Sequence, residues 1–197
     1  MFGSRARGDA SPRCRRGQHR LRTDRLLLCH PTVSDLRVAA AAASDRLAQR
    51  WLGWRPEQVI AEGLCAGLLA QRAGGGFHWA PIDSGWLIAV DTASGRIAGA
   101  VTVTGEQHEI GGWLAPQFRG RGLGRELFHG AVIFAHDHLA MATVLAGTER
   151  TNAACVGALL SAGFVATTGP ARHRLPDGRT VPSQWFRHDT DEPRYCR

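Results

Sequence analysis

The sequence contains no lysine, a single tyrosine and only five cysteines among its 197 residues. The cysteines are scattered, odd in number and never spaced C-x-x-C, so they indicate neither a disulfide framework nor a zinc site. No apolar run approaches the ~20 residues that cross a bilayer, and the N-terminus lacks the apolar centre of a secretory signal. We therefore expect a cytoplasmic protein with reduced thiols, without a metal and without membrane contact.

The net charge of +7 is concentrated near the N-terminus. Residues 1–25 contain eight arginines against Asp9 and Asp24, whereas the rest of the chain contains sixteen arginines and fifteen acidic residues. A basic tail can contact RNA or a ribosome, but the remainder of the chain is nearly neutral. Nucleic-acid or ribosome contact through the tail is therefore the weaker interpretation of the charge.

Length and composition predict one globular domain. Hydrophobic residues make up 44% of the chain and charged residues 21%, and a chain of this length buries ~70% of its unfolded surface on folding. Residues 1–20 are rich in Gly, Ser and Arg without hydrophobic periodicity, so we expect a disordered tail there. A single domain is expected over 21–190 and a C-terminal tail over 191–197, in a monomer or a homodimer.

The order of predicted elements is that of an α/β chain. Leu26–Cys29 is typical of a buried strand, and an Ala-rich helix is expected from Ser34 to about Gln49. A second helix with apolar i, i+4 spacing follows, with Trp51–Trp54 between the two helices. The second helix is expected at 56–71. Strands are then expected at 86–90, 96–103 and 109–114, followed by a helix at 123–139 and a strand at 143–146. The last predicted elements are a helix from 153 to Gly163, a strand at 164, and a hairpin around 176–178 that leads into a strand at 181–188.

The segment Arg119-Gly120-Arg121-Gly122-Leu123-Gly124-Arg125 lies between a predicted strand and an amphipathic helix. Alternate glycines allow successive N–H groups to point at one anion, and a helix N-terminus beginning near Leu123 favours negative charge. The pattern predicts a phosphate cradle, to which Arg119, Arg121 and Arg125 add charge. A glycine turn with a solvated basic face is the alternative. No Lys-Ser/Thr follows, which excludes a P-loop, and no acidic residue is placed as a dinucleotide fold requires.

In this context the sequence resembles a known family. The strand 109–114 followed by Arg119-x-x-Gly122-x-Gly124 resembles motif A of the GNAT superfamily of acetyl-CoA-dependent N-acetyltransferases. Asn152, followed by a helix ending in Gly163-Phe164, resembles the next motif of that family. Over roughly residues 21–190, the resemblance implies a mixed, mostly antiparallel sheet of six to seven strands flanked by about four helices.

Two upstream segments resemble the subgroup that acetylates ribosomal-protein N-termini. Residues 21–28 resemble its opening strand, and Trp51-Leu52-Gly53-Trp54 resembles its Trp-Leu-x-Trp segment. The resemblance places Trp51 and Trp54 at the wall of the acceptor cleft, while core packing is the alternative for both side chains.

The family's mode of binding coenzyme A transfers to matching residues here. It implies that backbone amides of the glycine loop bind the pyrophosphate and that the backbone of Trp113 and Leu114 pairs with the pantetheine arm. An N–H near Leu114 would stabilise the oxyanion, a contribution of ~3 kcal/mol. Asn152 would bind the pantetheine arm, or alternatively cap the following helix. The loop residues concerned are Arg119, Gly120, Arg121, Gly122, Leu123 and Gly124.

Attack on a thioester requires a neutral amine, and an α-amine with a pKa of about 7.7–8.0 is partly neutral near pH 7. A weak base therefore suffices. The candidates are Glu109, which we favour, and His108; neighbours on a strand face opposite ways, so at most one points inward. An exposed pair at the strand edge is the alternative. Glu106 and His78 are further candidates that the sequence does not rank.

The family's usual proton donor to the departing thiolate is missing. Many members carry a Tyr seven residues after the Asn, where this chain has Leu159, and Tyr195 lies in the tail. The ribosomal-protein subgroup often has a Ser three residues after the Asn, where this chain has Cys155, a weak donor or a plain packing residue. No activating base for a covalent acyl-cysteine is evident, because the nearest histidines lie on a different predicted helix.

The segment His136-Asp137-His138 does not predict a metal site. Side chains at i and i+2 on a helix point apart, so we expect a solvated helix C-terminus there.

The sequence supports three functions. The first is an acetyl-CoA-dependent N-acetyltransferase acting on a protein or peptide N-terminus by direct attack in a ternary complex. The second is acetylation of a small amine such as an antibiotic, polyamine or amino acid. The third, supported by the missing Tyr, is a non-catalytic acyl-CoA-binding regulatory module.

Overall fold

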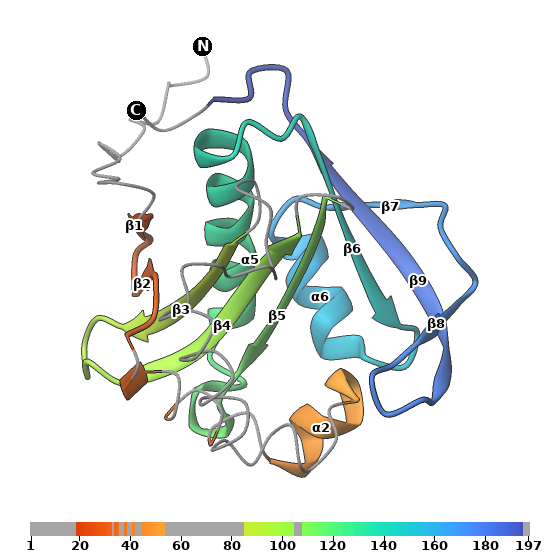
Figure 1. Cartoon of the computed structure of the whole chain (residues 1–197), viewed down its shortest axis with the longest axis horizontal. Helices are drawn as coiled ribbons and strands as arrows, with labels where there is room; N and C mark the ends of the chain where they lie inside the picture. Colours follow the sequence, from red (N-terminus) through yellow and green to blue (C-terminus); the bar gives the residue numbers. More distant parts are fainter. Residues whose placement is uncertain are drawn as a thin grey trace, which may run out of the picture.

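The computed structural model describes residues 19–32, 45–53, 85–104 and 108–194, together with Ser34, Asp35, Val38 and Ala41. Within this part of the chain, one sheet contains nine strands in the order β1-β2-β3-β4-β5-β6-β9-β7, with β8 pairing to β9 (Figure 1). The strands are β1 (Arg20–Arg22), β2 (Leu26–Cys29), β3 (Gly85–Asp91), β4 (Ile97–Thr104), β5 (Glu109–Leu114), β6 (Thr143–Glu149), β7 (Val165–Thr167), β8 (Arg172–Arg174) and β9 (Thr180–Asp189).

The predicted mixed, mostly antiparallel sheet is confirmed. Only the β5–β6 pair among the described strands is parallel, and the other pairs are antiparallel. The strand count exceeds the expected six to seven. The excess comes from β1 and β8, each three residues long, which is too short to show a period of two in the sequence.

Three α-helices are present in the described ranges. They are α2 (Arg46–Leu52), α5 (Leu123–Ile133) and α6 (Ala153–Ser161), with a short 3-10 turn, η1, at Pro116–Phe118. The predicted helix over 123–139 is confirmed, although its last turn, η2 (Phe134–His138), is a wider π-helical turn. No helix of the described ranges is both long and apolar enough to cross a membrane.

The expected Ala-rich helix that continues to Gln49 is wrong at its C-terminal end. Asp45 has an extended backbone with ψ of 149°, and its side chain accepts hydrogen bonds from the N–H groups of Leu47 and Ala48. An N-cap of this kind starts a new helix, so Trp51 belongs to α2 rather than to a connection. The predicted helix over 56–71 lies outside the described residues.

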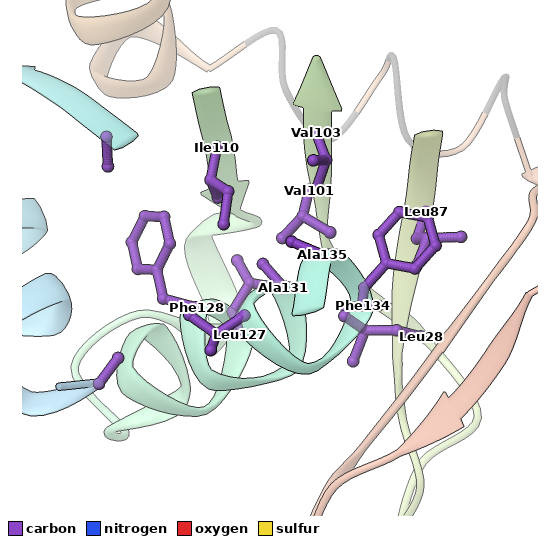
Figure 2. Close-up of a cluster of buried hydrophobic side chains, with 14 of the residues drawn as sticks. Leu28, Leu87, Val101, Val103, Ile110, Leu127, Phe128, Ala131, Phe134 and Ala135 are labelled. Carbon is purple, nitrogen blue, oxygen red and sulfur yellow. The ribbon is translucent and has the colours of Figure 1, made fainter. Parts of the chain in front are cut away.

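Helix α5 forms the centre of the hydrophobic core because its apolar residues recur every three or four positions. Leu127, Ala131 and Phe134 are almost completely buried, and Figure 2 shows them directed toward side chains of the sheet. The opposing residues are Leu28, Leu87, Val101, Val103 and Ile110. Helix α6 packs beside α5 and contributes Leu159 to the same cluster.

Strands β5 and β6 meet at one end only. Glu109 lies opposite Leu145, and the Leu145 N–H donates to the His108 carbonyl at 2.7 Å. No further register pair joins the two strands in the described residues, and they diverge in Figure 1 with α6 behind the opening. The backbone edges of both strands therefore face a gap inside the sheet.

Candidate active site

A cavity of about 260 Å³ occupies the opening between β5 and β6. Its walls come from both strands, from the start of α6, from α2 and from the β8–β9 hairpin. The lining residues are Trp51, Leu52, Glu109, Ile110, Gly111, Gly112, Phe128, Ala146, Gly147, Thr148, Glu149, Asn152, Cys155, Leu159, His173, Leu175, Pro176 and Val181. The site thus unites segments that are more than a hundred residues apart in sequence.

The backbone of Leu114 faces away from β4. Leu114 lies opposite Gly99, and the next residue, Ala115, donates its N–H to the Ala98 carbonyl at 2.8 Å. Because polar groups alternate in direction along an antiparallel pair, the N–H and C=O of Leu114 point to the other side, toward the gap. The carbonyl accepts a hydrogen bond from Arg119 Nε at 2.9 Å. The N–H of Leu114 is therefore not used in the pairing of β5 with β4.

The glycine loop has the curled backbone expected of an anion cradle. Gly120 and Gly122 have positive φ angles of 70° and 73°, which glycine adopts without steric cost. Helix α5 begins immediately afterwards at Leu123, so the N–H groups of its first turn lack partners within the helix. Gly124 serves packing instead, since a Cβ there would lie 3.1 Å from Ala158 Cβ of α6.

The expectation that the Arg119 side chain adds charge for a phosphate is wrong. Its guanidinium makes a bidentate ion pair with Asp45, at 2.8 Å and 2.6 Å, and its charge is therefore already balanced. The side chains of Arg121 and Arg125 are exposed, and the Arg121 guanidinium lies 5.6 Å from the centre of the Phe118 ring. These two side chains remain candidates to contact a phosphate.

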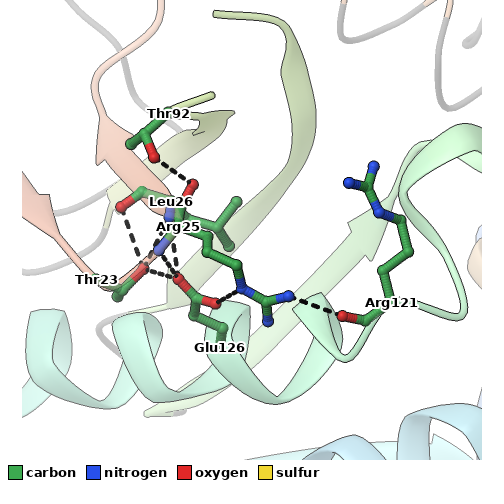
Figure 3. Close-up of polar contacts among 6 residues, drawn as sticks. All are labelled: Thr23, Arg25, Leu26, Thr92, Arg121 and Glu126. Carbon is green, nitrogen blue, oxygen red and sulfur yellow. Dashed lines mark hydrogen bonds and ion pairs between the residues drawn. The ribbon is translucent and has the colours of Figure 1, made fainter. Parts of the chain in front are cut away.

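The glycine loop is also anchored to the turn between β1 and β2 (Figure 3). Glu126, in the first turn of α5, accepts hydrogen bonds from the Thr23 hydroxyl at 2.6 Å and from the backbone N–H groups of Arg25 and Leu26. Burial raises the pKa of Glu126, but these donors outweigh it and hold the pKa below its ordinary value. Arg25 also donates to the Arg121 carbonyl at 2.9 Å, which fixes the loop from outside.

Glu109 lies in the cavity wall, whereas His108 is exposed in a turn with φ of 50° and is not among the lining residues. Burial raises the pKa of Glu109, and the nearby His173 opposes this effect. A carboxyl group with a raised pKa is a better proton acceptor at neutral pH than an ordinary one. Of these two candidate bases, only Glu109 lines the cavity.

Asn152 caps α6, as one of the two sequence interpretations expects. Its Oδ1 accepts a hydrogen bond from the Cys155 N–H at 3.2 Å, which leaves the amide NH₂ as a possible donor to a ligand in the cavity. Burial raises the pKa of the Cys155 thiol, and a hydrogen bond with Thr148 opposes this effect. The thiol therefore stays protonated, as a donor requires. Leu159 is fully buried.

Trp51 projects into the cavity from α2, with the Arg50 guanidinium stacked 4.5 Å from its ring centre. Trp54 lies outside the described residues, as do Glu106, His78 and Tyr195. Trp51 therefore lines the cavity, and its assignment to the acceptor side stays a prediction.

The expectation of a solvated helix end at His136 and His138 is wrong, because both side chains are buried, each 5% exposed. The π-helical turn directs them inward. His136 Nδ1 donates to the Met141 carbonyl, and its Nε2 lies 3.0 Å from His188 Nδ1. His138 lies 3.3 Å from the imidazole of His19. No group of three potential metal ligands occurs among the described residues.

Three residues of the site were missed by sequence reasoning. Asp45 had a usable signal, since an Asp before a helical segment is a common N-cap. Glu126 and His173 had none, because they meet Thr23 and Glu109 only through long-range folding.

Comparisons with known proteins agree with this geometry. Residues 25–165 match a family model described as an acetyltransferase (GNAT) domain. A search of curated protein sequences finds no match.

Solved structures share the fold at low sequence identity. Ribosomal-protein-S5-alanine acetyltransferase from Vibrio fischeri has 14% identity, covers 89% of this chain and 98% of its own, and gives a TM-score of 0.67. Spermidine N-acetyltransferase from Vibrio cholerae, solved with CoA and spermine, has 16% identity and a TM-score of 0.69. The match covers 86% of this chain and 98% of the spermidine N-acetyltransferase chain. The Microcin C7 self-immunity acetyltransferase MccE, solved with acetyl-CoA and AMP, has 13% identity, coverages of 85% and 94%, and a TM-score of 0.65. The family match shows that this chain belongs to the GNAT family and is an N-acetyltransferase.

Proposed function

We propose that the protein transfers an acetyl group from acetyl-CoA to the α-amine of a protein or peptide, by direct attack within a ternary complex. The observation that carries the proposal is the composition of the cavity wall. Most lining side chains are apolar, and the described lining includes two carboxylates, Glu109 and Glu149.

The donor side of the cavity suits a pantetheine arm and its diphosphate. The outward-facing backbone of β5 ends at Leu114, and the glycine loop and first turn of α5 follow within ten residues. An extended ligand with amide groups can hydrogen-bond to an open strand edge as an added strand does. In this proposal the amides of Arg119 to Gly124 hold the pyrophosphate, and Leu114 and the Asn152 amide hold the arm. The backbone polar groups of Trp113 point toward Ala100 of β4, so Trp113 takes no part in this pairing. The structural relatives solved with CoA or acetyl-CoA support the choice of donor.

The reaction needs a base, an oxyanion donor and an acid. The amine nitrogen forms a bond to the thioester carbonyl carbon while Glu109 accepts a proton from the nitrogen, directly or through water. The Leu114 N–H stabilises the negative charge that develops on the carbonyl oxygen. The carbon–sulfur bond then breaks, and the thiolate takes a proton from the Cys155 thiol, which regains one from solvent.

The acceptor side favours an N-terminus over a polyamine. A polycationic substrate needs several carboxylates, but the described lining of the cavity offers two, Glu109 and Glu149, of which Glu109 is assigned to the base. Trp51, Leu175 and Val181 instead offer apolar surface to the first side chains of a peptide.

The test is acceptor-dependent release of the CoA thiol. Peptides with Ser, Ala or Thr at the N-terminus are compared with the same peptides blocked at the α-amine, and with spermidine, spermine and an aminoglycoside panel. We expect release with the open peptides and none with the blocked ones. Mass spectrometry of the peptide should show one added acetyl group at its first residue.

The other outcomes identify the alternatives. Release with polyamines or aminoglycosides only would overturn the α-amine proposal in favour of a small-amine acetyltransferase. If the protein binds acetyl-CoA but releases no CoA thiol with any acceptor, the regulatory module is favoured. Leu159 at the position of the family's Tyr agrees with that alternative.

A further inference from the structure

Helix α2 is too short to hold its own position. It has seven residues, and isolated helices below ~12–15 residues are marginal in water. It nevertheless carries Trp51 and Leu52 into the cavity wall. Its placement must therefore come from contacts at its two ends.

The N-terminal end of α2 is held by Asp45. One carboxylate oxygen, Oδ1, caps the helix through the N–H groups of Leu47 and Ala48 and also accepts from Arg119 Nη1 at 2.8 Å. The other oxygen accepts from Arg119 Nη2 at 2.6 Å. Both side chains are about one quarter exposed, so the pair is better shielded from solvent than a surface ion pair.

The same guanidinium reaches the end of β5. Arg119 Nε donates to the Leu114 carbonyl at 2.9 Å, while the two terminal nitrogens bind Asp45. A planar guanidinium with donors on two edges fixes both partners in one plane. Arg119 thus connects the helix that bears Trp51 with Leu114, whose N–H is assigned to the oxyanion in the proposed mechanism.

The C-terminal end of α2 is held by the β8–β9 hairpin. Arg179 Nη2 donates to the Arg50 carbonyl at 3.0 Å, and its Nε is paired with Asp177 at 2.6 Å. The left-handed C-cap Gly53 is packed so closely that a Cβ would lie 2.5 Å from Leu175 Cβ. The hairpin therefore fixes one end of the helix, and the Asp45–Arg119 pair fixes the other.

We propose that Asp45 and Arg119 are positioning residues that align the acceptor wall on α2 with the thioester end of β5. The inference rests on the proposed acetyl transfer and adds to it a determinant of acceptor binding. Loosening the pair frees the cavity wall that carries Trp51, and this weakens binding of the acceptor.

Two substitutions separate the ion pair from the helix cap. Asn and Ser are both good N-caps, so Asp45→Asn and Asp45→Ser keep the cap while the charged bidentate contact is lost. Arg119→Lys additionally removes the contact to the Leu114 carbonyl. Asp189→Asn is the matched control, because the exposed side chains of Asp189 and Arg187 pair at 3.4 Å and Asp189 does not line the cavity.

We expect the two Asp45 variants to raise KM for the acceptor about tenfold, with kcat and the Kd for acetyl-CoA within twofold of wild type. Arg119→Lys should raise acceptor KM similarly and also lower kcat, and its combination with Asp45→Asn should add nothing to KM. Hydrogen exchange of residues 46–52 should accelerate at least fivefold in the Asp45 variants but not in Asp189→Asn.

The outcomes separate the two proposals. If the wild type acetylates peptides and the Asp45 variants keep acceptor KM and α2 exchange unchanged, the positioning role is overturned. An equal rise in acceptor KM and in the Kd for acetyl-CoA would also overturn it, since that pattern indicates a general structural defect. Faster α2 exchange in the variants, combined with a wild type that acetylates no amine, would instead overturn the proposed function.

Discussion

Gly99 of β4 lies so close to Trp113 of β5 that a Cβ on the glycine would overlap the Trp113 carbonyl oxygen. The obstructing atom is backbone and cannot rotate away. The peptide that joins Trp113 to Leu114 would therefore have to move, and this peptide carries the N–H assigned to the oxyanion.

We expect Gly99→Ala to lower kcat about 10–100-fold, because loss of one oxyanion donor typically costs 10²–10³ and a displaced donor costs less. Steady-state kinetics with a saturating peptide acceptor measure the effect. Gly157→Ala is the control, since a Cβ at this exposed position of α6 meets nothing within 4 Å. A Gly99→Ala variant that is folded and fully active would refute the assignment of the Leu114 N–H.

Glu109→Gln should lower kcat/KM about 10²-fold, because glutamine has the shape of the base without its proton affinity. A base acts in its ionised form, so wild-type activity rises with pH through the raised pKa of Glu109. In the variant this rise at the acid side of the pH profile, the acid limb, should vanish. Only the rise caused by ionisation of the acceptor α-amine, with a pKa near 7.7–8.0, should remain.

Profiles of kcat/KM between pH 5 and pH 9 provide the measurement, with His108→Asn as the control because Asn tolerates the left-handed backbone at this position. The assignment fails if the His108 variant loses the acid limb and the Glu109 variant keeps it.

Glu126→Gln should destabilise the fold by about 1–3 kcal/mol, since the charged oxygens that serve Thr23, Arg25 and Leu26 are replaced by an amide. The pKa of Glu126 is lowered in the folded protein. Its contribution is therefore present above the unfolded-state pKa of the carboxyl and is lost as pH falls through the folded-state pKa. Urea unfolding of both proteins should show a difference at pH 7 that shrinks as the pH is lowered toward the folded-state pKa. A constant difference over this range would contradict the explanation.

The buried histidines should make the fold sensitive to mild acid. Burial lowers the pKa of His138 and His188, and lowers the pKa of His19 to about 4. Below pH 6.5 the unfolded chain binds protons that the folded chain rejects, so stability falls from pH 6.5 toward the folded-state pKa values.

His188→Asn tests this effect, because the Asn amide can still donate to His136 Nε2 while it cannot be protonated. The variant should lose less stability than wild type between pH 7.5 and pH 5, as measured by the urea midpoint. An identical loss in both proteins would exclude His188 as a contributor.

The sequence predicted those parts of the site that depend on residues close together in the chain, and missed those that depend on residues far apart. The strand Glu109–Leu114, the glycine loop and the Asn152 cap are local patterns, and the structure places each of them in the expected element. The pairing of Arg119 with Asp45 spans 74 residues, and no local pattern reveals it. For the same reason the sequence assigned the charge of Arg119 to a ligand when the fold uses it internally.

The helical region shows a second limit. Alanine runs favour helix wherever they occur, so propensity alone extended the first helix through Asp45. The competing preference of an Asp side chain for backbone N–H groups instead begins helix α2 at this point. The inward turn of His136 and His138 depends on a π-helical turn, which the regular 3.6-residue period does not anticipate.

The divergence of β5 and β6 creates two strand edges in the interior of a sheet rather than at its margin. Exposed margins invite pairing with strands of other molecules and promote aggregation. Here the two edges face each other across a narrow opening, with α6 behind it, so a folded protein strand with neighbours on both sides has no access. A slender chain of amide groups can enter where a folded strand cannot, so these two edges keep hydrogen-bonding backbone available for a ligand without offering it to another protein's strand.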